Sequence, residues 1–113
     1  MKVNVLYKGR VIASQIALAD NFWLRLSGYM FREIPHVPGI LFEPCSSIHT
    51  SFMSFDLDLI FLSGENKIVK IIRNLKPWRH TWFYFNSKRT LEMPAGVLPL
   101  ELKEGDTLEV VHV

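Results

Sequence analysis

Apolar and polar residues alternate along much of the chain, and a period of two is typical of β-strands with one buried face. The alternation begins at once, with Val3, Val5 and Tyr7 on one side of an extended segment. Residues 2–7 and 11–14 flank the tripeptide 8–10, whose central glycine suits a tight turn. The sequence therefore predicts a β-hairpin at the start of the chain.

A second hairpin is predicted in the middle of the chain. Residues 46–62 form a long extended pattern that becomes apolar on both faces toward its end. The turn-forming residues 63–66 follow, and 67–73 return as a strand. Shorter apolar segments predict further strands at residues 40–42, 82–85, 90–93 and 107–113.

One segment breaks the alternation. Between Asp20, which can cap a helix, and Gly28, which can end one, apolar residues recur at helical spacing. We therefore expect an α+β fold of mostly antiparallel β-strands, a small barrel-like or sandwich sheet with one principal helix near residues 19–27.

The bulk properties are those of one globular domain. With 113 residues and 49% hydrophobic residues, the chain can bury a sufficient core, so we expect a single domain over residues 1–113 without a linker. Cys45 is the only cysteine, which excludes an internal disulfide and predicts a reducing, cytoplasmic location. No targeting segment or membrane span is predicted. The net charge of +2 is too mild to imply a polyanionic partner.

Four motifs, in order along the chain, carry a resemblance to a known family. They are Arg25-Leu26-Ser27-Gly28-Tyr29-Met30-Phe31-Arg32, then Gly39-Ile40-Leu41-Phe42, then His49-Thr50 with Phe52-Met53 and residues 57–62, and finally residues 91–96 with Gly105-Asp106. Together they resemble the uncharacterised family called domain of unknown function 192. The chain departs from the family pattern at Phe55-Asp56, where a proline is common. The resemblance implies a shared fold, but it implies no catalytic residue, because the function of that family is not established.

Several side chains are candidates for chemistry. Cys45 and His49 are four residues apart, about 13 Å on an extended segment, so they pair only if the chain bends between them. The four histidines are scattered and predict no local metal chelate. No glycine-rich phosphate loop is present. We therefore expect no metal, no cofactor and no identifiable catalytic motif.

Two alternatives to a simple binding module stay open. One is a small hydrolase-like enzyme in which His49 is the base and Asp58 orients it. The other is weak binding of single-stranded nucleic acid by residues 76–89, where basic residues are interleaved with aromatic ones. The near balance of charge in the whole chain argues against the nucleic-acid reading.

The prediction for function is a small soluble binding or accessory module for an anionic small molecule, with its ligand, partners and pathway unknown. Cations beside apolar residues either extend into water or converge on a ligand. If they converge, the anion site is formed where three segments meet: residues 25–32, 49–50 and 76–79. Its predicted members are Arg25, Arg32, His49, Thr50, Lys76 and Arg79.

Overall fold

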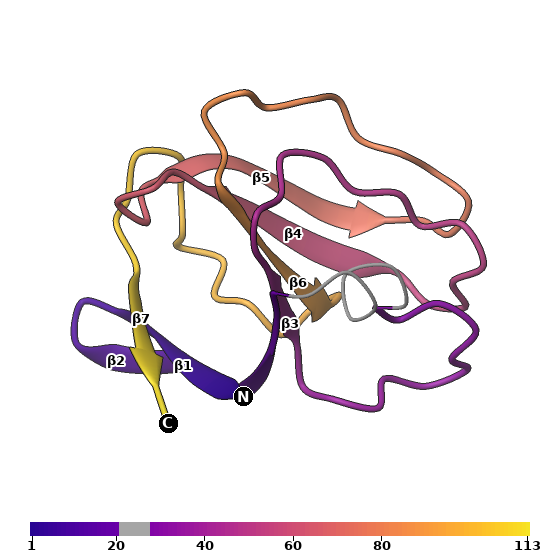
Figure 1. Cartoon of the computed structure of the whole chain (residues 1–113), viewed down its shortest axis with the longest axis horizontal. Helices are drawn as coiled ribbons and strands as arrows, with labels where there is room; N and C mark the ends of the chain where they lie inside the picture. Colours follow the sequence, from indigo (N-terminus) through magenta and orange to yellow (C-terminus); the bar gives the residue numbers. More distant parts are fainter. Residues whose placement is uncertain (21–27) are drawn as a thin grey trace.

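The computed structural model describes residues 1–20 and 28–113, and in these residues the chain forms one seven-stranded sheet (Figure 1). The strands follow one another in the order β5-β4-β6-β3-β2-β1-β7. Their bounds are β1 Lys2–Tyr7, β2 Arg10–Ala19, β3 Ile40–Phe42, β4 Leu57–Leu62, β5 Ile68–Leu75, β6 Arg89–Pro94 and β7 Glu109–His112.

The predicted α+β class with a principal helix near residues 19–27 is wrong. The described residues contain no helix, and Ala19, where that helix was expected to begin, is the last residue of β2. The physical reason is pairing: Ala17–Ala19 lie in register with β3, which holds them extended. Residues 21–27, the rest of the expected helix, lie outside the described residues.

The barrel-like or sandwich arrangement is also corrected, because the strands form a single mixed sheet that does not close. Within the described strands, β2 and β3 are the one parallel pair, and the other neighbours are antiparallel. The two ends of the sheet meet at one isolated bridge between Lys67 and Thr107. A single bridge joins the corner but provides no continuous ladder.

Side chains on the two faces of the sheet belong to two separate cores. On β4, Ile60 and Leu62 join one core, whereas Leu57, Leu59 and Phe61 join the other. Every side chain of β4 is buried, because both faces of the strand are covered, and apart from Asp58 the strand is apolar throughout. The first core also holds side chains of β1, β2 and β7, and the second is covered by residues 28–56 and by Tyr84.

Strand positions were predicted unevenly. The hairpin of β1 and β2 and the short β3 are where the sequence placed them, although β2 continues to Ala19. Residues 82–85 form no strand, and only 57–62 of the expected 46–62 strand belong to the sheet. These two segments are covering loops, joined by one backbone bond from the Tyr84 amide to the Ser46 carbonyl, and the other backbone bonds of residues 46–56 run mainly to neighbouring turns.

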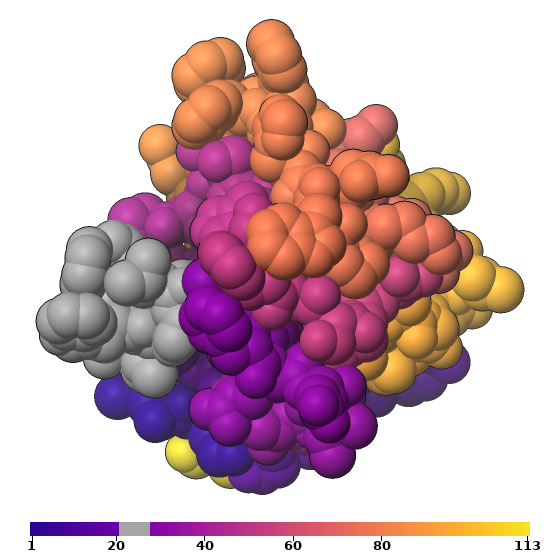
Figure 2. Space-filling model, turned by 90° about the vertical axis from the view of Figure 1, so that its right-hand side faces the viewer, coloured from indigo at the N-terminus to yellow at the C-terminus, as the bar shows by residue number. Residues whose placement is uncertain are grey.

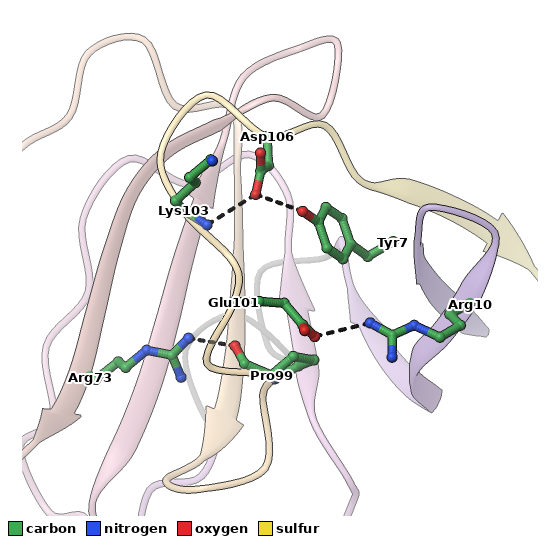
Figure 3. A network of polar contacts seen from close by, with 7 residues as sticks. All are labelled: Tyr7, Arg10, Arg73, Pro99, Glu101, Lys103 and Asp106. Atoms are coloured by element: carbon green, nitrogen blue, oxygen red, sulfur yellow. Dashed lines mark hydrogen bonds and ion pairs between the residues drawn. The ribbon is translucent and has the colours of Figure 1, made fainter.

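A loop of residues 95–108 leads from β6 to β7 across one end of the sheet and is held by polar contacts (Figure 3). The Tyr7 hydroxyl donates to Oδ2 of Asp106 over 3.0 Å. Nη2 of Arg73 donates to the Pro99 carbonyl over 2.6 Å, and Arg10 pairs with Glu101 over 2.9 Å. These contacts fix the loop that closes the first core.

Candidate functional site

A pocket of about 380 Å³ opens on the second face of the sheet. This volume lies within the range of small-ligand sites. Its floor comes from β3 and β6, and its walls come from the loop after β3 and from the segment after Gly28. The described lining residues are Gly28, Tyr29, Met30, Phe42, Pro44, Cys45, Ser46, Ser47, Ile48, His49, Met53 and Glu92.

Glu92 is the charged group of this pocket. It lies on β6 between Leu91 and Met93, which face the first core, so its own side chain points to the second face. There its neighbours on the adjoining strands are Ile40 and Leu59, both apolar. The residue is 3% exposed. A carboxyl group is therefore placed among aliphatic side chains at the base of a cavity.

The Glu92 carboxyl faces the pocket, and the described residues supply no partner for it. Among the described residues, no hydrogen bond or ion pair is made by its side chain, whereas five other acids form ion pairs: Glu43, Asp56, Asp58, Glu101 and Glu104. The residue lines the open space of the pocket. A buried acid of this kind is expensive unless it stays protonated or meets a ligand.

Burial raises the pKa of Glu92 from its ordinary value of 4.5 to about 8. At neutral pH the group thus holds its proton. The nearby Tyr29 is affected in the same sense: burial first, and then the charge of Glu92, raise the pKa of its hydroxyl. That hydroxyl donates to the Val37 carbonyl over 2.9 Å and stays protonated.

One wall of the pocket, residues 45–49, is held by the segment after β5. The amide of Ile48 donates to Oγ1 of Thr81 over 3.0 Å, and the Thr81 amide donates to the Ile48 carbonyl over 2.8 Å. His49 and His80 form an isolated antiparallel bridge. The Cys45 thiol donates to the Ser47 carbonyl over 3.1 Å. Cys45 and His49 therefore line one pocket, because the chain bends between them.

The six residues of the predicted anion site occupy different positions. His49 lines the pocket, and Arg32 and Arg79 are exposed. Lys76 pairs with Asp56 over 2.6 Å. Thr50 is fully buried: its hydroxyl donates to the Lys76 carbonyl over 2.7 Å and accepts from the Arg79 amide over 2.8 Å. Arg25 lies outside the described residues.

His49 and Asp58, the residues of the hydrolase alternative, are not brought together. Asp58 shares its face of β4 with Ile60 and Leu62, in the first core, whereas His49 lines the pocket on the second face. The Asp58 carboxylate accepts from the amides of Asn74 over 2.8 Å and Gly96 over 3.0 Å. It thus holds the end of β5 and the turn after β6, away from His49.

The aromatic-basic segment, residues 76–89, is largely exposed. Trp78 and Trp82 are 59% and 77% exposed, so the indoles are available to a partner. Elsewhere in the described residues, no three histidine, cysteine or acidic side chains are grouped as metal ligands. No helix formed by the described residues is long and apolar enough to cross a membrane.

Sequence reasoning missed Glu92 as a site residue. In the sequence, Glu92 stands between the apolar residues Leu91 and Met93. This is the pattern of a strand whose acid faces solvent. It is buried because loops cover the second face of the sheet, which no local pattern reveals. The one available signal was its position inside the motif Leu91-Glu92-Met93-Pro94-Ala95-Gly96.

Two archaeal relatives match most of the chain. The UPF0127 protein of Pyrococcus furiosus is 35% identical over 108 residues, covering 90% of this chain and 91% of that protein. The UPF0127 protein of Thermococcus sibiricus is 30% identical, covering 90% of this chain and 70% of that protein.

A solved structure has the same fold. The crystal structure of a protein of unknown function from Novosphingobium aromaticivorans superposes with a TM-score of 0.78, at 23% identity, over 96% of this chain and 84% of that one. The model of the DUF192 family, described as "Uncharacterized ACR", matches residues 3–110. The four motifs and these matches agree, and the chain belongs to the DUF192 family.

Proposed function

We propose that the protein is a small-molecule-binding module whose pocket takes a ligand with a protonated amine, and that Glu92 is the group that recognises it. The observation that carries this proposal is the buried Glu92 carboxyl at the base of the cavity, with no partner among the described residues. An ammonium group placed beside it would supply the missing counter-charge. Binding would then release the proton that Glu92 holds at neutral pH.

The composition of the pocket supports a cation more than an anion. Its described lining contains one acid and no lysine or arginine, so the described residues supply no fixed positive charge. Hydroxyl groups of Ser46 and Ser47 at the rim add neutral hydrogen-bonding partners. Phe42, Ile48 and Met53 provide an apolar wall for the carbon skeleton of the ligand. The predicted anion site stays a second candidate, with the same pocket wall at His49.

The test measures how affinity depends on pH, using n-butylamine and butyrate as probes of equal size. If an ammonium ion binds ionised Glu92, its affinity should rise about tenfold per pH unit up to about pH 8, because the carboxyl must lose its proton. Calorimetry in two buffers of different ionisation enthalpy should show proton release. If butyrate binds instead and its affinity falls over the same range, the anion candidate is correct and the amine proposal is wrong.

Two variants make the test specific. Glu92→Gln keeps the shape of the neutral side chain but cannot become negative, so amine binding should be lost. Glu65→Gln removes an exposed acid from the turn before β5 and serves as the matched control, in which amine binding should be unchanged. Equal binding of butylamine to the wild type and to Glu92→Gln would exclude Glu92 as the recognition group.

We also propose that the protein works in a reducing compartment, the cytoplasm. The single cysteine supports this, because a secreted domain of this size is usually stabilised by paired cysteines. Fractionation of cells that produce the protein, followed by immunoblotting, tests this location directly.

A further inference from the structure

Six aromatic side chains of the covering turns and loops are exposed in two groups, and we call the two groups together the aromatic surface. Figure 2 shows the side of the molecule on which residues 76–89 rise at the top and continue to the centre, where they meet segments from the first half of the chain. Exposed apolar side chains in such number mark an interaction surface. The aromatic surface comprises Phe31 (75% exposed), Phe52 (46%), Trp78 (59%), Trp82 (77%), Phe83 (57%) and Phe85 (82%).

The rings are arranged, not scattered. Phe31 stacks on Phe52 with ring centroids 4.9 Å apart, and Phe52 meets Trp78 edge-on at 4.7 Å. Three turns that are distant in sequence thus place their tips in one row. Phe83 and Phe85 form a second stacked pair at 6.3 Å.

Backbone strain marks the same row. Phe31, Phe52 and Trp78 each have a φ of +62°, in the left-handed region that bulky side chains rarely adopt. Glycine or asparagine would occupy these turn positions more easily. A chain that retains three strained, exposed aromatic residues at neighbouring turns is hard to explain by folding alone, and such strain is typical of binding surfaces.

The three turns are also tied together by backbone hydrogen bonds. The Phe31 amide donates to the Phe52 carbonyl over 2.9 Å, and the Trp78 amide donates to the Thr50 carbonyl over 2.9 Å. The Thr50 amide donates to the Arg79 carbonyl over 2.7 Å. The row is therefore held in place before any partner arrives.

Charge near the aromatic surface identifies the kind of partner. Residues 66–91 contain seven of the thirteen lysines and arginines of the chain and no acid. Four of the seven are paired with acids from other segments. In the described part of the chain, Lys67, Arg79 and Lys88 have no ion pair. Arg79 follows Trp78 directly, whereas Lys67 and Lys88 line a hollow beside Phe85 that Glu65 and Glu104 line as well. The aromatic surface thus combines a large apolar area with these few cations.

This combination fits an anionic lipid bilayer, and we propose that the aromatic surface docks on one. Tryptophan and phenylalanine side chains that project from a surface enter the headgroup region, while a few lysines and arginines attract anionic lipid. Single-stranded nucleic acid would need more cations to follow its phosphates. Three available cations suit steering toward a membrane better than tracking a polyanion.

The experiment is vesicle co-sedimentation with phosphatidylcholine alone and with phosphatidylcholine containing phosphatidylglycerol. The wild type should bind the anionic vesicles, and salt should weaken that binding. Phe31→Asn and Trp78→Asn should each reduce it about tenfold, because apolar insertion is lost. Since asparagine accepts the left-handed backbone, thermal unfolding should show that both variants remain folded.

Leu100→Asn is the matched control. It removes an equally exposed apolar side chain (87% exposed) from the loop after β6, and binding should not change. Absence of binding to any vesicle, or equal loss in all three variants, would overturn the proposal. Two other results would also overturn the proposal if no vesicle is bound. One is binding of the unlabelled oligonucleotide dT20 that depends on Phe31 and Trp78, and the other is self-association that depends on these two residues.

Discussion

Two buried acids lie on neighbouring strands, and the sheet separates them. Asp58 on β4 is in register with Met93, and Glu92 on β6 is in register with Leu59. The two acids are therefore one position apart in the pairing of these strands, but their side chains point to different faces of the sheet. Asp58 accepts hydrogen bonds from two backbone amides and lies 3.8 Å from Nη1 of Arg73. Glu92 faces a pocket, and in the described residues no partner meets it.

The difference separates an acid with a role in folding from an acid available for a ligand. A buried carboxylate that accepts amide hydrogen bonds stabilises the turns that donate them. A buried carboxyl without such partners reduces stability whenever it ionises, and this cost is a reason to look for a ligand. Burial alone thus does not identify a site residue; the partners of the group do.

The largest effect is expected at Asp58. Asp58→Ala should lower the free energy of unfolding by about 3–5 kcal/mol, because the backbone amides of Asn74 and Gly96 and the Arg73 guanidinium lose a buried acceptor. Urea denaturation at pH 7 measures this change. Asp56→Ala, which breaks a more exposed ion pair with Lys76, is the control and should cost less than about 1 kcal/mol. Equal effects of the two substitutions would contradict the structural role of Asp58.

The next effect is the pH dependence that Glu92 causes. Since folding raises its pKa to about 8 from 4.5, the native state binds a proton that the unfolded state releases between these values. Stability should therefore fall as the pH rises from about 5 to 8. Glu92→Gln should remove this slope and be more stable than the wild type at pH 9, by about 2 kcal/mol after relaxation of the ionised site. Parallel pH profiles of the two proteins would show that Glu92 is not the cause.

A smaller effect on stability is expected at Arg73. It shows whether the ion pair or the backbone amides hold Asp58. Its charge is 3.8 Å from Asp58, whereas the amides of Asn74 and Gly96 are within 3.0 Å. Arg73→Met should therefore cost about 1–2 kcal/mol, mostly through lost bonds to the carbonyls of Leu98 and Pro99. Guanidinium denaturation of both variants gives the comparison. A cost as large as that of Asp58→Ala would mean that the ion pair, not the amides, holds Asp58.

The sequence predicted most of the sheet because strand periodicity is local. Residues 40–42 and the turn at Gly9 were placed correctly, since apolar runs and a turn glycine are visible in a few residues. The helix near 19–27 was wrong because Ala17–Ala19 are held extended by β3, a partner more than twenty residues away. A local helical pattern carries no information about such a pairing.

The pocket was harder to predict than the sheet. Its rim depends on Thr81 holding Ile48, a contact across 33 residues, and on loops that cover the second face. His49 was selected from the sequence and does line the pocket, but Glu92 looked like a surface acid. Periodicity shows which residues share a face, but not whether that face is covered.

The pairing of the first strand with the last constrains how this chain can fold. In β1, Val3 and Val5 are in register with His112 and Val110 of β7, while the other edge of β1 pairs with β2. On a ribosome, β1 and β2 emerge first and can form their hairpin, but the edge of β1 stays unpaired until β7 is synthesised. The sheet therefore depends on contacts between residues far apart in the chain, and such pairing in general forms slowly and leaves strand edges exposed to aggregation. A chaperone that shields the edge of β1 during synthesis would raise the yield of folded protein.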